Sequence, residues 1–187
     1  MAETDQPDVL RFVDVPVERK SAWGPGEYAS RQIEINGQIL GNLLTARTGT
    51  TIEQSTPLVD QHVGVVTPAA YLRALLGGPK DDILEEGRIA IGYCDACLDG
   101  TCGTLLAATL GVEGDAVTWS AIGFEVFDDG QVPKLTPFWK KAAPRPEAET
   151  TARWTPAPFI PEISLRFRRA QYLEALQAER RRLAAQQ

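Results

Sequence analysis

The sequence has few histidines and cysteines, two residue types that often bind metals or take part in catalysis. Its 187 residues include one histidine, His62, and three cysteines. Walker A, dinucleotide-binding glycine, G-x-S-x-G and H-E-x-x-H patterns are all absent. No apolar run reaches the roughly 18 residues that a membrane span needs. The first residues, MAETDQPDVL, are acidic and polar, whereas a secretory signal begins basic and continues apolar. We therefore expect a cytoplasmic protein with no membrane association and no familiar catalytic motif.

Basic residues are also scarce outside the C-terminal segment. The net charge of the chain is −6. Residues 166–187 hold six arginines and two glutamates, a charge of +4, so residues 1–165 carry −10. Phosphate contacts need clustered basic side chains, so this acidic body predicts no nucleic-acid partner. The run Arg180-Arg181-Arg182 is interpreted as a solvated helix end, where cations complement exposed carbonyls.

The chain length suits one domain over residues 1–187. VLRFVDVPV has the composition of a strand, which Pro16 ends or places at a sheet edge. SAWGPGEYAS is predicted to be a loop because of its glycines and proline. YASRQIEINGQILGNLL predicts a hairpin, since Asn36-Gly37 suits a two-residue turn and Ile39 resumes the alternation that precedes it.

One helix and three strands are predicted next. Thr67 caps a helix in VVTPAAYLRALLGGP, with Pro68 at its first position. Its apolar stripe is formed by Tyr71, Leu72, Leu75 and Leu76. Gly77-Gly78-Pro79 is expected to end the helix. RIAIGYC, GTLLAATLGV and DAVTWSAIGF predict an antiparallel meander, the last two strands joined at EGD. In the third, Val117, Trp119 and Ala121 are expected on one face.

The last part of the chain divides into an extended segment and a helix. Residues 133–161 contain seven prolines and are predicted to hold no regular element. Residues 166–187 predict a helix with Ala170, Leu173, Leu176 and Leu183 on one side. The sequence thus predicts an α+β fold, in which an N-terminal hairpin and a central meander form antiparallel sheet, with a middle helix and a C-terminal helix.

All three cysteines, Cys94, Cys97 and Cys102, lie in IGYCDACLDGTCG, the loop expected between the first two meander strands. A C-x-x-C pair with a third thiolate can hold tetrahedral zinc. The fourth ligand would then be His62 from across the fold, or one of the loop aspartates Asp95 and Asp99. Zinc is the only cofactor that the sequence suggests.

Three other interpretations of these cysteines stay open. A C-x-x-C pair can cycle through a disulfide, although here no helix follows to stabilise a thiolate. An iron–sulfur cluster would need a further ligand. Cysteine is also a small, often buried residue, and the neighbouring glycines Gly100 and Gly103 suit a crowded turn. This last, purely structural interpretation is the preferred one.

Several segments together resemble a family of uncharacterised bacterial proteins. They are YCDACLDGTCGTLLAATL, VTWSAIGFE and RFRRAQYLEAL, with GEYASRQIEINGQIL upstream. The resemblance implies a C-x-C-G-E-x-G-C-like loop between strands, a V-T-W strand and a late F-x-F-D-R-A-Q-Y helix. This chain has C-x-x-C in the loop, and Arg168 stands where the family has the aspartate. The family implies no activity.

The function expected from the sequence is non-catalytic protein binding. An acidic body suits a basic protein partner of the kind that inhibitors and immunity proteins bind, because complementary charge steers association. The alternative is a zinc- or thiol-dependent enzyme centred on Cys94, Cys97 and Cys102.

Overall fold

The computed structural model describes residues 6–21, 24–55, 67–78, 84–85, 87–94, 104–127 and 154–186. Their elements are, in order, β1 (Leu10–Ser21), β2 (Gly24–Ile35), β3 (Gln38–Ile39), α1 (Leu40–Thr48), β4 (Gln54–Ser55), α2 (Pro68–Leu75), β5 (Arg88–Cys94), β6 (Thr104–Glu113), β7 (Ala116–Phe127), β8 (Trp154–Pro158), β9 (Leu165–Arg168) and α3 (Arg169–Ala185). The predicted α+β fold with antiparallel sheet, middle helix and C-terminal helix is confirmed.

The N-terminal sheet has the strand order β1-β2-β3. The predicted turn is confirmed, because Asn36 and Gly37 have φ angles of 52° and 82° between β2 and β3. The predicted loop over SAWGPGEYAS is wrong, since Gly24 pairs with Ser21 and begins β2. An antiparallel pair needs only two residues to reverse direction, so the glycines and Pro25 continue the ladder.

Helix α1 was not predicted. The segment that follows Ile39 was expected to continue as strand, but β3 ends there and α1 begins at Leu40. Leu40, Leu43 and Leu44 are buried, at helical spacing. Packing of this short apolar face in the core outweighs the local strand pattern.

The second sheet has the order β4-β5-β6-β7-β8, and β9 also pairs with β7. The predicted antiparallel meander is confirmed by β5, β6 and β7. β8 contradicts the prediction that residues 133–161 hold no regular element, since Pro156 and Pro158 pair with Glu125 and Gly123. Proline is tolerated in such a strand at the edge of a sheet, because its missing N–H has no second neighbour to serve. Residues 133–153 lie outside the described residues.

The alternation in β7 breaks where the pairing with β6 shifts register. Val117 and Trp119 are buried as expected, with exposed fractions of 2% and 0%. Ala121 does not continue that face. It has a φ of 47°, and Ile122 is the next buried residue. The extra residue lies in β7, since Thr109 pairs with Ser120 but Ala107 pairs with Gly123, and this bulge accounts for the change of face.

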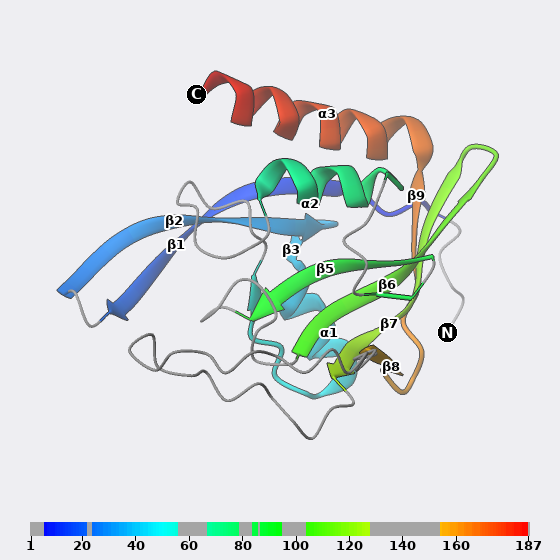
Figure 1. Cartoon of the computed structure of the whole chain (residues 1–187), viewed down its shortest axis with the longest axis horizontal. Helices are drawn as coiled ribbons and strands as arrows, with labels where there is room; N and C mark the ends of the chain where they lie inside the picture. The colour runs from blue at the N-terminus through cyan, green and yellow to red at the C-terminus, as the bar shows by residue number, and fades with distance from the viewer. Residues whose placement is uncertain are drawn as a thin grey trace, which may run out of the picture.

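Helices α2 and α3 lie side by side along one side of the molecule, as Figure 1 shows. The predicted cap of α2 is confirmed, because the Thr67 hydroxyl accepts a hydrogen bond from the Ala70 N–H over 3.2 Å. The helix ends at Leu75, so Leu76 is 41% exposed and is not part of the buried stripe.

The C-terminal helix is shorter than predicted, and the predicted face is buried only in part: Leu176 is buried and Leu183 packs against the core. Residues 166–168 belong to β9, and α3 begins at Arg169. Ala170 is exposed, and the buried residues of the helix are Tyr172, Leu176 and Glu179. A search for apolar residues at helical spacing does not find a glutamate, so the burial of Glu179 was not predicted.

Candidate functional site

The cysteine loop is only partly within the described residues. Cys94 is the last residue of β5, and its backbone pairs with that of Gln54 in β4. Cys97, Cys102 and His62 lie outside the described ranges. Among the residues that are described, no three His, Cys, Asp or Glu side chains are grouped to hold a metal ion. The zinc site of Cys94, Cys97 and Cys102 therefore stays a prediction.

A buried ion pair between β5 and β7 is the most unusual polar feature in the second sheet. Arg88 and Glu125 are 5% and 0% exposed. The Arg88 Nε donates a hydrogen bond to the Glu125 Oε1, and its Nη1 donates to the Thr109 Oγ1 and the Ala121 carbonyl at 3.1 and 3.2 Å. Three adjacent strands thus surround one guanidinium group.

This pair leaves two polar atoms without a hydrogen bond to the described part of the chain, the Arg88 Nη2 and the Glu125 Oε2. Burial raises the pKa of Glu125, against the opposing effect of the Arg88 hydrogen bond and charge. These two atoms are the second donor and the second acceptor of the same side-on arginine–carboxylate pair.

Sequence reasoning missed this pair. The available signals were an arginine that opens the apolar run RIAIGYC and a glutamate inside AIGFEVF. Neither predicts a contact alone, since residues 37 positions apart meet only after the register of β5, β6 and β7 is set.

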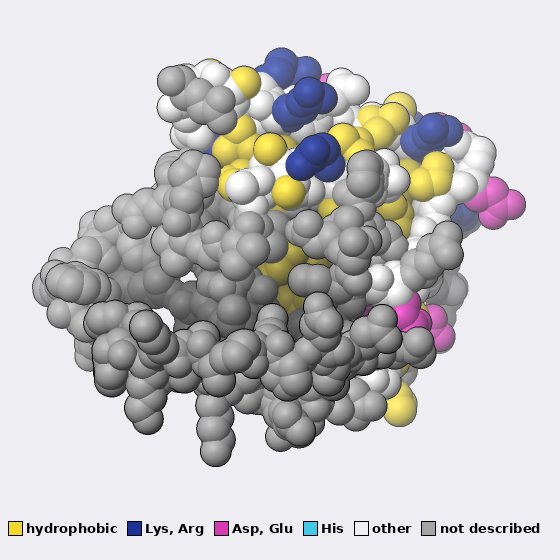
Figure 2. Space-filling view, in the orientation of Figure 1, with side chains coloured by type: hydrophobic (Ala, Val, Ile, Leu, Met, Phe, Trp, Pro, Cys, Tyr) yellow, Lys and Arg dark blue, Asp and Glu magenta, His cyan; other side chains and the backbone are white. Residues whose placement is uncertain are grey.

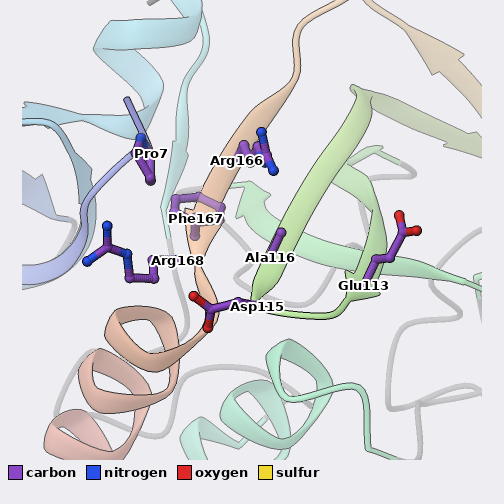
Figure 3. A pocket seen from close by; sticks show the side chains of 7 residues that line it. All are labelled: Pro7, Glu113, Asp115, Ala116, Arg166, Phe167 and Arg168. Carbon is purple, nitrogen blue, oxygen red and sulfur yellow. The ribbon is translucent and has the colours of Figure 1, made fainter. Parts of the chain in front are cut away.

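A surface pocket of about 270 Å³ lies between the N-terminal segment, the β6–β7 hairpin and β9. Figure 3 shows its labelled side chains, which include Arg166, Arg168, Glu113 and Asp115. The two arginines and the two acids balance in charge, so the electrostatics of the pocket favour neither an anion nor a cation.

A second ionic cluster joins the β1–β2 hairpin to α3. Glu179, whose side chain is 1% exposed, accepts hydrogen bonds from the Arg31 Nη2 and the Arg182 Nε at 2.9 and 2.7 Å. Arg31 also forms an ion pair with the exposed Asp14 at 3.2 Å. This cluster fixes the orientation of the hairpin relative to α3.

Apolar side chains are exposed at the end of α2 and on the neighbouring strand β6. Leu76 and Val112 are 41% and 54% exposed. A side chain at Gly77 would lie 3.6 Å from Leu110, so the end of α2 rests on β6 two residues from Val112. The start of α3 is tied to the same corner, because the Arg169 N–H donates to the Asp115 carbonyl over 2.8 Å.

Exposed arginines continue this surface along both helices. Arg73 of α2 and Arg169, Arg180 and Arg181 of α3 are exposed, and Glu174 is the one acidic residue with an exposed side chain on these two helices. Figure 2 shows basic side chains over α3 with hydrophobic side chains between them and α2. We call Leu76, Val112 and these four arginines the α2–α3 surface.

Comparisons with known proteins supply no relative: no protein-family model, no curated protein and no solved structure matches the chain. Among the described helices, none is both long enough and apolar enough to cross a membrane.

Proposed function

We propose that the protein is a non-catalytic module that binds another protein through the α2–α3 surface. The single observation that carries the proposal is the exposure of Leu76 and Val112 in a region where α2 and α3 together expose four arginines. Exposed apolar groups rimmed by polar residues are typical of protein contacts, and arginine is enriched there.

The charge of this surface indicates the chemistry of the partner. Residues 166–187 carry +4, whereas the rest of the chain carries −10. A partner that covers Leu76 and Val112 brings its own surface against arginines, so an acidic contact region is favoured over a basic one. The whole-chain charge had pointed to a basic partner. The described apolar surface instead favours an acidic one.

The test compares proteins recovered by the wild type with those recovered by Leu76→Asp and by Arg73→Glu. Both residues are exposed, so both variants are expected to fold. The matched control is Arg47→Glu, which makes the same charge change on α1, far from α2 in Figure 1.

The expected result is one protein recovered by the wild type and the control and bound about tenfold more weakly, once purified, by the two surface variants. Equal affinity for all four proteins would overturn the proposal. So would a partner that proves to be a nucleic acid.

The alternative, a zinc- or thiol-dependent enzyme at Cys94, Cys97 and Cys102, has a separate test. Native mass spectrometry of protein purified without chelator and with reductant would show an added zinc mass that is lost on denaturation. A structural zinc further predicts unfolding on chelation, whereas a catalytic one predicts loss of activity in Cys→Ser variants that still fold. A bare polypeptide mass would argue against zinc and leave a packed turn.

A further inference from the structure

We propose that the surface pocket over Ala116 binds a free amino acid with an aliphatic side chain, whose carboxylate contacts Arg168 and whose ammonium group contacts Glu113. The volume of the pocket is about 270 Å³. Sites for drug-sized ligands usually have about 300–1,000 Å³, so this pocket suits a smaller molecule. The proposal is independent of the α2–α3 surface, because Val112 and Glu113 are consecutive in β6 and consecutive side chains of a strand point to opposite faces.

The register of three strands places the two charged groups on either side of a small residue. Ala116 of β7 pairs with Glu113 of β6 and with Arg168 of β9. Directly paired residues have their side chains on the same face, and adjacent strands lie about 4.8 Å apart. Arg168 and Glu113 therefore flank Ala116 on one face of the sheet, as the close-up in Figure 3 shows. The short methyl side chain between them leaves space for a ligand.

The charges around this space select a zwitterion. In the part of the chain that the structure describes, Arg168 forms no ion pair with Glu113 or with Asp115, the second acid of the pocket. An anion alone would be repelled by these two carboxylates, and a cation alone by the two arginines. An amino acid gives its carboxylate to the guanidinium and its ammonium group to the glutamate, and adds no net charge.

The apolar part of the lining indicates the side chain of the ligand. Pro7, Ala116 and Phe167 also line the pocket. Phe167 is 1% exposed, so the apolar contact comes chiefly from Pro7 and Ala116, which are partly exposed. An aliphatic side chain that covers them removes apolar surface from water, which favours binding.

Backbone hydrogen bonds hold two walls of the pocket in place. The Asp8 N–H donates to the Arg166 carbonyl over 2.6 Å, and the Asp8 Oδ2 accepts from the Arg166 N–H over 2.8 Å, which fixes the segment that contains Pro7. The Asp115 carbonyl accepts from the Arg169 N–H over 2.8 Å and ties the β6–β7 turn to the end of β9. A site formed before the ligand arrives loses less conformational entropy on binding.

The test is an NMR titration of the whole protein with L-leucine, isocaproate and isoamylamine. The last two have the carbon skeleton of leucine without the ammonium group and without the carboxylate, respectively. We expect leucine to cause saturable shifts of the backbone amide signals of Ala116 and Arg168. Its dissociation constant should be on the order of 1 mM, because contacts with exposed charges are weak, and each analogue should bind about fivefold more weakly.

Charge variants assign each end of the ligand. Arg168→Gln should weaken leucine binding about fivefold and leave isoamylamine unaffected, whereas Glu113→Gln should weaken leucine binding equally and leave isocaproate unaffected. The matched controls are Arg180→Gln and Glu162→Gln, which remove the same charges at exposed positions outside the pocket and should bind leucine as the wild type does.

A steric variant tests the position of the ligand. Ala116→Val fills the space between Arg168 and Glu113 with a residue that suits a strand, so the protein should fold and lose the response to leucine.

Three results would overturn the proposal. Two come from the wild type alone, and they decide the question even if a variant fails to fold. They are the absence of a saturable response to leucine at Ala116 and Arg168, and binding of isocaproate or isoamylamine as tight as that of leucine. The third is undiminished binding of leucine by folded Ala116→Val, which would place the ligand elsewhere.

Discussion

The indole N–H of Trp119 donates a hydrogen bond to the hydroxyl of Tyr172 over 3.2 Å, and that hydroxyl donates one to the carbonyl of Leu75 over 2.8 Å. One phenol therefore joins β7, α3 and α2. Phe167 packs against both rings, at centroid distances of 5.2 and 5.4 Å. Trp119 and Tyr172 are 0% and 2% exposed, so this link between three elements lies in the core.

Removing the hydroxyl of Tyr172 should destabilise the protein more than removing that of Tyr71. Tyr172→Phe leaves the Trp119 N–H and the Leu75 carbonyl unpaired, which we expect to lower the free energy of unfolding by about 2 kcal/mol. Tyr71→Phe loses one bond, to the Ile91 carbonyl, and should cost about 1 kcal/mol. Urea titration followed by tryptophan fluorescence measures both. A loss in Tyr172→Phe no larger than that in Tyr71→Phe would argue against the three-element link.

Glu179 should be the residue on which the contact between the hairpin and α3 depends. Glu179→Gln keeps the shape of the side chain but leaves Arg31 and Arg182 without their buried carboxylate. We expect a loss of about 3 kcal/mol in the free energy of unfolding, because the buried carboxylate that pairs with two arginines loses its charge.

Asp14→Asn is the matched control for Glu179→Gln. It removes a second carboxylate from the same arginine, but Asp14 is 61% exposed, and exposed pairs contribute about 0–1 kcal/mol. Urea titration of the two variants side by side should separate them clearly. Similar losses would mean that burial of Glu179 does not set the strength of this contact.

The N-terminus of α3 should gain stability from a capping residue. Arg168 has the extended backbone of an N-cap, with φ −72° and ψ 124°, but its side chain makes no capping bond. Arg168→Asn supplies a capping oxygen without a second carboxylate near Asp115, and should raise the free energy of unfolding by about 1 kcal/mol.

The control for Arg168→Asn is Arg180→Asn, an exposed position inside α3 where asparagine is a poorer helix former and cannot cap. That variant should lose a few tenths of a kcal/mol, about the difference in helix propensity. Thermal unfolding gives the order of the three proteins. A lower melting temperature for Arg168→Asn than for wild type contradicts the capping account.

The stability of the wild type relative to Glu125→Gln should depend on pH. Burial raises the pKa of Glu125, with Arg88 opposing the shift, so the folded state holds this proton more tightly than the unfolded chain does. Above the unfolded pKa, about 4.3, the wild type therefore loses free energy of unfolding relative to the variant as pH rises toward the folded value. Urea titrations at successive pH values measure the difference. If the free energy of unfolding of the wild type relative to Glu125→Gln stayed constant or rose with pH, the raised pKa would be contradicted.

Short sequence motifs correctly predicted the structural features that depend on only a few neighbouring residues. The Asn36-Gly37 turn and the Thr67 cap need particular residues at particular backbone angles, and both were found. α1 and β8 were missed because their neighbours in the fold decide them, the core for α1 and β7 for the proline-containing β8.

The candidate sites, too, depend on contacts between distant parts of the chain that sequence patterns do not predict. The cysteines stand together in the sequence and drew the prediction, but two of them lie outside the described ranges. Arg88 and Glu125 meet only through strand register, and the end of α2 reaches Leu110 of β6 only through the packing of the helix on the strand. No spacing rule along the chain reports contacts of this kind.

The most direct test of the α2–α3 surface is site-specific photo-crosslinking in cells, with a photoreactive amino acid in place of Leu76 and, as control, in place of Arg47. The account predicts an adduct at position 76 to one protein, joined through a segment rich in acidic residues, and no such adduct at position 47. No adduct at position 76 beyond the level at position 47, or an adduct to nucleic acid or lipid, would contradict it.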